Sequence, residues 1–246
     1  MNQNAFPSSS NADNDLQAQF DRWAAAYDAD VAASAAEGES GGHGFPFAGY
    51  DRVLARVVAL AAVAPGMAVL ELGPGTGNLT AQLVARGAAV WALDFSAEML
   101  ARARVRVPTA TFAQAHLLGD YPPDFHRSFA CVASTYTFHE LPLPDKLTLL
   151  RRLFADHLRP GGAVAIGDVG SAAKWVSVKR AGEMLAASMA GVSSPIPNLF
   201  VSSGTRFEPS SAAQVTIVLS GLRKWEANVA RIFALRMPSR YSSRSS

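Results

Sequence analysis

One short stretch carries the residue types that a nucleotide-binding turn needs, an acid followed by three alternating glycines. It reads Val69-Leu70-Glu71-Leu72-Gly73-Pro74-Gly75-Thr76-Gly77-Asn78. Glycine adopts positive φ and lets a ligand approach the bare backbone. The residues before the turn are apolar apart from Glu71, and a periodic apolar segment (79–85) follows, so the sequence predicts a buried strand, a tight turn and a helix that opens at Asn78. The free N–H groups of that helix point toward the turn, where an open α/β sheet binds its ligand.

The spacing of the glycines separates two kinds of nucleotide site. A dinucleotide-binding turn needs G-x-G-x-x-G, and its third glycine would fall at Asn78. The spacing found is G-x-G-x-G. A nicotinamide or flavin oxidoreductase is therefore disfavoured. A tight β–α turn without any ligand remains the plain alternative, because short glycine patterns recur by accident.

A second carboxylate, Asp94, follows the next predicted strand (88–93). It lies 21 residues after Gly73 (94 − 73), close to the spacing at which Rossmann-like folds place an acid on a ribose diol. A carboxylate suits this task because it accepts hydrogen bonds from two adjacent hydroxyls at once. The alternative is that Asp94 caps the helix that begins at Ser96.

Three stretches resemble the class I S-adenosylmethionine-dependent methyltransferases. The glycine turn resembles motif I of that family, and a run that follows the predicted strand 129–134 resembles motif IV. The motif IV run reads Thr135-Tyr136-Thr137-Phe138-His139-Glu140-Leu141, and the stretch that resembles the entry helix reads Phe20-Asp21-Arg22-Trp23-Ala24-Ala25-Ala26-Tyr27-Asp28. The similarity covers Phe20 to Asp168 and is greatest to a group of small bacterial methyltransferases.

The resemblance implies S-adenosylmethionine as the cofactor, with the glycine turn under its methionine part and a Tyr-Asp pair closing over it. Residues and resemblance together predict cofactor contacts at Tyr27, Glu71, Gly73, Pro74, Gly75, Thr76, Gly77, Asn78, Asp94, Phe95, Ser96, Met99, Gln114, Ala115 and Ser134. The acid that binds the adenine amine in the family is matched here by Ala115. That contact therefore passes to the Gln114 amide or to a backbone carbonyl, either of which accepts a hydrogen bond.

Methyl transfer from a sulfonium is an in-line displacement, for which alignment supplies most of the rate enhancement. A base assists when the acceptor is a protonated oxygen or nitrogen. His139 is the candidate, since histidine titrates near neutral pH, and Glu140 is a weaker second candidate. The alternative for His139 is an orienting or packing role. The five histidines are scattered and Cys131 is the single cysteine, so no metal site and no internal disulfide is predicted.

Composition indicates one globular domain with additions. The chain has 246 residues, of which 49% are hydrophobic, and a net charge of +2. The charge is unevenly distributed: residues 1–170 hold 12 Lys/Arg against 17 Asp/Glu, whereas residues 171–246 hold 10 against 3. The two parts therefore differ in character.

The expected organisation is a disordered segment 1–14, a cofactor-binding domain 15–170 and a divergent Ser/Arg-rich region 171–246. The fold expected for the domain is α/β, a Rossmann-like, doubly wound, mostly parallel sheet with helices on both faces. Helices are predicted at 15–33, 51–64, 96–106 and 146–158, and strands at 68–72, 88–93, 110–115, 129–134 and 163–166. In the last helix Leu147, Leu150, Leu153, Phe154 and Leu158 are predicted to face inward.

The C-terminal region is harder to interpret. The pattern allows a helix at 174–190 and a strand at 215–219. Trp225, Val229, Ile232 and Phe233 fall on one helical face, so the two strands that finish the family's sheet remain uncertain. Without them the strand at 163–166 has an exposed edge, and loose packing is expected after about residue 193.

No secretory signal is predicted, because residues 1–15 are polar and acidic. The most apolar window, 53–72, contains Arg56 and the pair Pro65-Gly66, so no membrane span is predicted either. A cytoplasmic location follows by default. We expect a monomer or a homodimer.

The function expected is methyl transfer to a small-molecule acceptor. A nucleic-acid acceptor is disfavoured, because no aromatic-basic motif interleaves in the tail and no N-P-P-[YF] run follows the fourth strand. A non-catalytic or damaged cofactor-binding protein remains an alternative.

Overall fold

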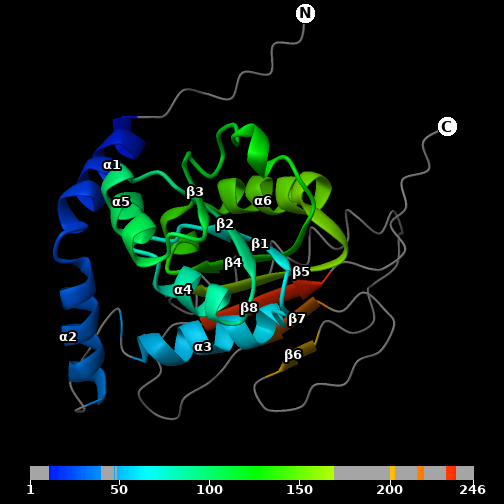
Figure 1. Cartoon of the computed structure of the whole chain (residues 1–246), viewed down its shortest axis with the longest axis horizontal. Coiled ribbons are helices and arrows are strands. Elements are labelled where there is room, and N and C mark those ends of the chain that lie inside the picture. Colours follow the sequence, from blue (N-terminus) through cyan, green and yellow to red (C-terminus); the bar gives the residue numbers. More distant parts are fainter. Residues whose placement is uncertain are drawn as a thin grey trace, which may run out of the picture.

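The computed structural model describes residues 11–39, 47, 49–168, 200–202, 215–218 and 231–236. The strands of this part of the chain are β1 (Ala68–Leu72), β2 (Ala89–Asp94), β3 (Thr111–Gln114), β4 (Phe129–Thr135), β5 (Leu158–Asp168), β6 (Phe200–Ser202), β7 (Val215–Val218) and β8 (Arg231–Arg236). They form one sheet in the order β3-β2-β1-β4-β5-β8-β7-β6 (Figure 1). Strands β1 to β5 run parallel, whereas β8 is antiparallel to both β5 and β7.

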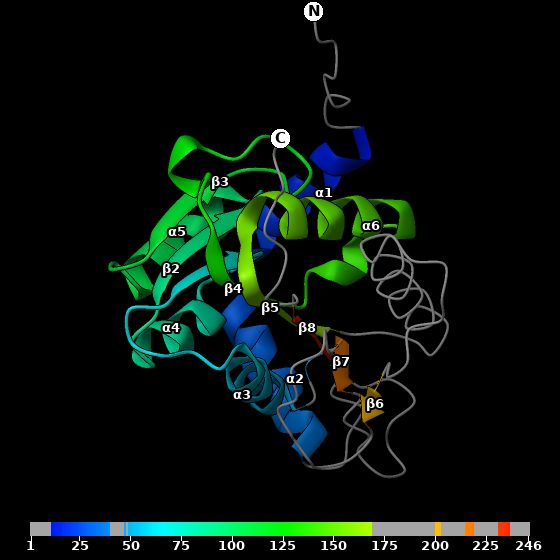
Figure 2. The same ribbon diagram turned by 90° about the vertical axis from the view of Figure 1, so that its right-hand side faces the viewer.

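Helices cover both faces of this sheet (Figure 2). The helices of the described ranges are α1 (Asn11–Trp23), α2 (Tyr27–Glu39), α3 (Tyr50–Ala61), α4 (Asn78–Ala85), α5 (Ala97–Arg106) and α6 (Leu143–Arg152), with short helical turns η1 (Pro123–Phe125), η2 (Phe138–Glu140) and η3 (Leu153–His157). No helix in the described residues combines the length and apolar character that crossing a membrane requires. The predicted α/β, Rossmann-like, mostly parallel fold is confirmed.

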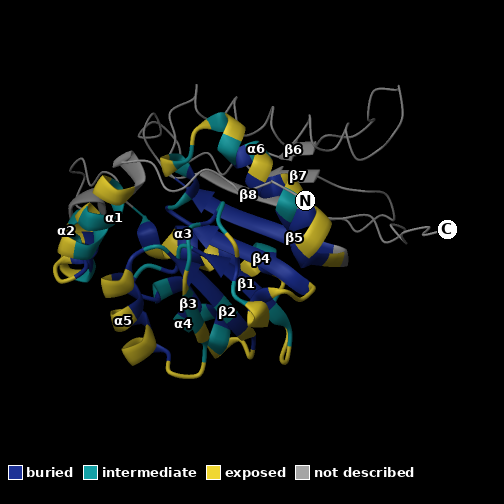
Figure 3. Ribbon diagram, turned by 90° about the horizontal axis from the view of Figure 1, so that it is seen from above, coloured by how far each residue is buried: buried dark blue, intermediate teal, exposed yellow. Residues whose placement is uncertain are grey.

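The core has two halves, one on each face of the sheet. Alternate residues of a strand point to opposite faces, so Val69 joins the cluster under α3 and α4, and Leu70 joins the cluster under α6. The central strands are therefore buried on both sides, as the dark blue strands of Figure 3 show. Near-continuous apolar strands such as β4 are typical of a parallel sheet covered on both faces.

The helices and strands predicted around the site agree with those observed. Strand β1 has the predicted limits, and β2, β3, β4, α3 and α5 begin and end within three residues of them. The predicted single helix 15–33 is wrong, because α1 ends at Trp23 and α2 begins at Tyr27. The break lets the Trp23 ring contact Tyr27 edge-on, with centroids 4.8 Å apart, and its Nε1 donate to Asp30 at 2.6 Å. Residues 11–14 lie in α1, so the predicted disorder is wrong there, and residues 1–10 lie outside the described ranges.

The predicted helix 146–158 also ends early. Helix α6 ends at Arg152, the π-helical turn η3 follows, and β5 already begins at Leu158. The Pro-Gly-Gly stretch thus lies within β5, where the register against β4 is irregular between Phe129 and Cys131. An irregular strand accommodates glycines that would otherwise end an element. In α6 Leu150 is buried as predicted, Leu149 is buried as well, and Leu147 is only half-buried.

Strand β8 replaces a helical face that was predicted near the C-terminus. The predicted helical face at Ile232 and Phe233 is wrong, since both residues lie in a strand that pairs with Ile166 and Gly167 of β5. The edge of β5 is therefore covered, against expectation, and the sheet continues past residue 170. A helical spacing over so short a run does not distinguish helix from strand. The strand predicted at 215–219 is confirmed as β7. The helix predicted at 174–190, and Trp225 and Val229, lie outside the described residues.

Candidate functional site

The glycine turn lies at the point where the chain changes direction across the sheet. Strand β1 has β2 on one side and β4 on the other. Open α/β sheets bind ligands at the carboxyl ends of their strands at such a point. The turn after β1, the end of β2 and the end of β4 therefore define the candidate site.

The three glycines of the turn all have positive φ, but they are required for different reasons. A Cβ on Gly73 would lie 2.1 Å from Oγ1 of Thr137, and one on Gly77 would lie 3.2 Å from Cα of Ala103. Gly75, with φ +54°, has no described atom within 4 Å of that position. Gly73 and Gly77 therefore allow close packing, whereas Gly75 presents bare backbone to open space. This is the feature that a ligand contact requires.

Asp94, the last residue of β2, is hydrogen-bonded to the glycine turn. Its Oδ2 accepts a hydrogen bond from the Gly75 N–H at 3.0 Å, and its Oδ1 accepts one from the Ser96 N–H at 2.9 Å. Burial raises the pKa of Asp94 to about 6, although these backbone donors act to lower it. Each oxygen keeps lone pairs beyond its single backbone bond, so Asp94 can still accept from a diol.

The cap of α5 is Ser96 and not Asp94. Ser96 Oγ accepts the Met99 N–H at 3.1 Å, which is the N-cap hydrogen bond. The same hydroxyl donates to Oδ1 of Asp21, at 2.5 Å, and so ties α1 to the start of α5. Ser96 and Met99, both predicted to contact the cofactor, are buried.

Glu71 is a buried carboxyl at the end of β1. Its Oε2 accepts a hydrogen bond from Thr80 at 2.7 Å, whereas its Oε1 has no partner among the described residues. Burial raises the pKa of Glu71 to about 8. The side chain is therefore protonated at neutral pH, and a carboxylic acid can donate as well as accept.

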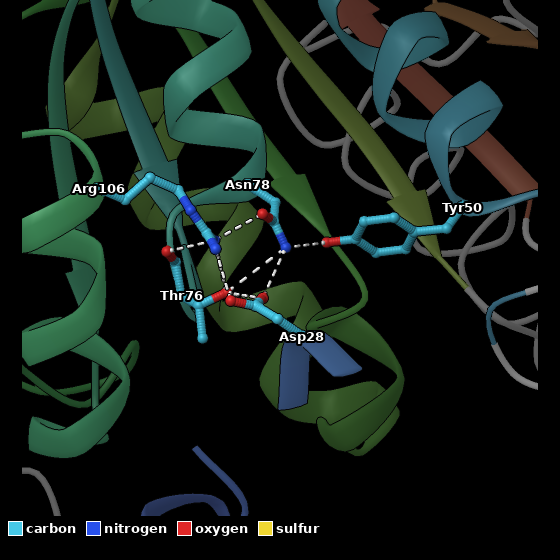
Figure 4. A network of polar contacts seen from close by, with 5 residues as sticks. All are labelled: Asp28, Tyr50, Thr76, Asn78 and Arg106. Atoms are coloured by element: carbon cyan, nitrogen blue, oxygen red, sulfur yellow. Dashed lines mark hydrogen bonds and ion pairs between the residues drawn. The ribbon is translucent and has the colours of Figure 1, made fainter. Parts of the chain in front are cut away.

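A polar network joins the glycine turn to three helices (Figure 4). Asp28 of α2 accepts from Thr76 at 2.6 Å and from Asn78 at 3.2 Å, and it forms an ion pair with Arg106 of α5. Arg106 also donates to the Thr76 carbonyl at 2.8 Å and to the Asn78 side-chain oxygen at 2.6 Å. Asn78 reaches Tyr50 Oη of α3 at 3.3 Å. Burial alone would raise the pKa of Asp28, but the bonds from Arg106 and Thr76 outweigh it and lower that pKa.

Several other residues that were predicted to contact the cofactor form hydrogen bonds or ring contacts within the protein. Gln114 donates to the Phe95 carbonyl at 2.9 Å, and the Phe95 ring meets Phe20 edge-on at 5.4 Å. Ala115 N donates to the Asp94 carbonyl at 2.9 Å. Ser134 is fully buried and donates to the Leu72 carbonyl at 2.7 Å, which ties β4 to β1.

Tyr27 belongs to an aromatic cluster beside the turn. Its ring contacts Trp23 and Phe47, and Tyr50 stacks on Tyr136 at 5.2 Å. Tyr136 has φ +53° and a buried hydroxyl without a hydrogen-bond partner in the described residues. A bulky residue with positive φ is strained, and such strain concentrates at functional sites.

His139, in η2 after β4, is held between two carboxylates. Its Nδ1 lies 2.7 Å from Asp168 Oδ1, its backbone N–H donates to Asp168 Oδ2 at 2.7 Å, and its Nε2 lies 2.9 Å from Glu140 Oε1. Burial would lower the pKa of His139, but the hydrogen bonds to Asp168 and Glu140 raise it to about 9. The ring is therefore an imidazolium at neutral pH. This does not fit the expected general base, which must be free to accept a proton.

Two residues of the site, Arg106 and Asp168, were not among those predicted. Asp28 was expected near the cofactor from the Tyr-Asp pair of the entry helix, but the sequence does not show that it pairs with Arg106. Asp168 ends β5 as Asp94 ends β2, and an acid at a strand's carboxyl end is the signal that would have identified it.

Comparisons with known proteins agree with this geometry. A family model described as a methyltransferase domain matches residues 69–162. An uncharacterised methyltransferase of Geobacillus kaustophilus is 36% identical over 154 residues, covering 61% of this chain and 64% of its own length. Another, from Geobacillus thermodenitrificans, is 35% identical over 155 residues with the same coverage. The match thus spans less than two thirds of either relative.

A solved structure is also similar. The S-adenosylmethionine-dependent methyltransferase of Mesorhizobium loti is 29% identical, with a TM-score of 0.41, over 46% of this chain and 52% of that one. The family model coincides with the region that holds β1 to β4, the glycine turn, Asp94 and His139. Residues 69–162 therefore form a methyltransferase domain.

Proposed function

We propose that this chain transfers a methyl group from S-adenosylmethionine to a small-molecule acceptor. The observation that carries the proposal is the pairing of Gly75, open to a ligand, with the buried Asp94 carboxyl bonded to its N–H. Gly75 offers backbone to the methionine part, and Asp94 offers carboxylate oxygens to the ribose diol. When bound, the cofactor would supply an electrophilic methyl group on sulfur, with the thioether as the leaving group for displacement by the acceptor atom.

The protein's own residues arrange the reactants. Asp94 and the glycine turn fix the cofactor on the β1–β2 side, which leaves the ends of β4 and β5 for the acceptor. The network of Asp28, Thr76 and Arg106 holds α2 and α5 beside the turn. Such alignment supplies much of the rate enhancement of a displacement reaction.

The acceptor side carries two carboxylates, Asp168 and Glu140, paired with a single imidazolium. This charge disfavours a nucleic-acid backbone, whose phosphates bind to Lys and Arg. A small-molecule acceptor accords better with it.

Calorimetry with S-adenosylhomocysteine tests the proposal. Binding is expected for the wild-type chain, and NADH is expected not to bind. A hydrogen bond to a charged acceptor contributes about 1.5–3 kcal/mol, so Asp94→Ala should weaken binding about 10- to 100-fold. Asp124→Ala, at an exposed position, is the matched control. Binding of NADH without S-adenosylhomocysteine would refute the proposal.

A further inference from the structure

Helices α1 and α2, the N-terminal arm of the chain, contact both turns of the candidate cofactor site. Asp21 of α1 accepts a hydrogen bond from Ser96, in the turn after β2, at 2.5 Å. Asp28 of α2 accepts one from Thr76, in the glycine turn after β1, at 2.6 Å. The N-terminal arm therefore bridges the two turns to which the proposed function assigns the cofactor.

The glycine turn has one half that is open and one half that is held by α5. Gly75 has no described atom within 4 Å of the position of a Cβ. Gly77 packs closely on α5, since a Cβ there would lie 3.2 Å from Cα of Ala103, and the Thr76 carbonyl accepts from Arg106 at 2.8 Å. The position of the open backbone thus depends on contacts made behind it.

Arg106, the last residue of α5, connects these contacts to the N-terminal arm (Figure 4). It donates to Oγ1 of Thr76 at 2.9 Å and to Oδ1 of Asn78 at 2.6 Å, and it forms an ion pair with Asp28. At 1.5 Å per residue the length of α5 separates Arg106 from the end of β2 at Asp94 by about 14 Å. Because these donors go to protein groups, Arg106 acts on a bound ligand through the turn.

The link between the N-terminal arm and the turn is a closed set of three side chains. Asp28 bonds both Thr76 and Arg106, and Arg106 bonds Thr76 in turn. The side chains of Arg106 and Asp28 are 33% and 41% exposed. An ion pair of this exposure changes an equilibrium constant up to about fivefold, and salt screens it.

We propose that Arg106 is a positioning residue that makes docking of the N-terminal arm and ligand binding at Gly75 favour each other. The inference rests on the proposed function, because it takes that ligand to be the cofactor. Docking of α2 through Asp28 fixes Thr76 and so the backbone beside it. By linkage, docking strengthens binding by the same factor by which binding strengthens docking.

Calorimetry with S-adenosylhomocysteine tests one direction of this coupling. Asp28→Asn and Arg106→Gln should each weaken binding about fivefold. The double variant should also lose about fivefold, and not about 25-fold, because both substitutions remove the same link. Raising sodium chloride from about 0.05 to about 0.5 M should weaken binding to the wild type about threefold and leave that of Arg106→Gln nearly constant.

Hydrogen exchange tests the other direction. S-adenosylhomocysteine should slow exchange of the α2 amides about fivefold in the wild type and leave it unchanged in Arg106→Gln. Asp15→Asn on α1 and Arg102→Gln on α5 remove exposed charges from the same two parts of the chain. Both control variants should match the wild type in affinity and in exchange.

Effects that add in the double variant, or single variants that behave as the controls do, would overturn the inference. The ligand-free chain provides a separate test, because Asp28→Asn should raise exchange of the amides of residues 75–78 about fivefold. Unchanged exchange there would also overturn it. Absence of S-adenosylhomocysteine binding to the wild type, with that rise present, would refute the proposed function and leave the link between the N-terminal arm and the turn standing.

Discussion

Two buried carboxyls flank the glycine turn, and their surroundings give them different protonation states. Asp94 accepts two backbone N–H bonds, and its pKa stays near 6, so it is ionised at neutral pH. Among the described residues Glu71 accepts only from Thr80, and burial raises its pKa to about 8. The difference follows the rule that donors to the charged form offset burial. Asp94 is thus suited to accept from hydroxyls, and Glu71 is suited to donate.

Glu71 should make the folded chain less stable as pH rises. Its folded pKa of about 8 lies above its ordinary value of 4.5, so the folded state retains a proton that the unfolded state has lost. The stabilisation is complete below about 4.5 and is lost as pH rises through about 8, at up to about 1.4 kcal/mol per pH unit. Glu71→Gln mimics the protonated form and should reduce this dependence. Urea unfolding at pH 6, 7, 8 and 9 measures it.

The exposed Glu98→Gln provides the same chemical change outside the core. It should leave the pH dependence of the unfolding free energy as in the wild type. If Glu71→Gln and Glu98→Gln gave the same profile, Glu71 would be ionised in the folded chain and the assigned protonation state would be wrong.

Sequence spacing identified the glycine turn and Asp94 as neighbours, which the structure shows, but it did not predict the carboxylates that surround His139. The glycines and Asp94 belong to one β–α–β unit, so a fixed spacing identifies them. The state of His139 depends on Asp168, 29 residues later, and on the ring orientation that only the packed β4 and β5 produce. A histidine in sequence gives only an unperturbed pKa, and the two carboxylates reverse the expected role.

Helices α1 and α2 form an N-terminal arm that two sets of contacts hold against the domain. Asp21 of α1 accepts from Ser96 at the start of α5, and Asp28 of α2 pairs with Arg106 at the end of α5. Both contacts are made at α5, one at its start and one at its end, so this helix holds the N-terminal arm against the domain. The break between α1 and α2 allows both contacts, and amphipathic spacing alone did not predict it.

Arg106→Gln should loosen α2. The Asp28 carboxylate would lose its ion-pair partner, and Thr76 and Asn78 would lose a shared donor. Partly exposed ion pairs contribute up to about 1 kcal/mol, and several bonds act together here, so exchange of the α2 amides with solvent deuterium should rise about 5- to 30-fold. Salt should produce a smaller change in the same direction in the wild type.

Arg102→Gln is the matched control on the same helix, at an exposed position. Exchange in α2 should match the wild type in this variant. Equal effects of the two substitutions would mean that helix charge, and not the network with Asp28, governs how α2 docks.

Across the whole molecule, one sheet joins the methyltransferase region to the C-terminal strands. Strand β8 pairs with β5 over six residue pairs, from Ala163 with Arg236 to Asp168 with Arg231. Asp168 is thus in the strand that β8 covers, which connects the far end of the chain to the candidate acceptor site. The parallel half was predictable from apolar runs between turns. In the antiparallel half β7 was predicted but β8 was not, because β8 is defined by its pairing with distant segments.

The amides of β8 should be protected from hydrogen exchange to within about tenfold of those in β1, since β8 lies between β5 and β7. Those of β6 should exchange faster, because β6 is at the edge of the sheet. Exchange of residues 231–236 at the rate of an unstructured peptide would show that the sheet ends at β5.

The central claim is that the glycine turn and Asp94 hold S-adenosylmethionine at the β1–β2 side of the site. A crystal structure of the chain with S-adenosylhomocysteine tests it most directly. The account predicts that both ribose hydroxyls lie within hydrogen-bond distance of the Asp94 carboxylate and that the homocysteine part lies against the backbone of Gly75. A complex with the ribose away from Asp94, or with the homocysteine part remote from the glycine turn, would contradict it.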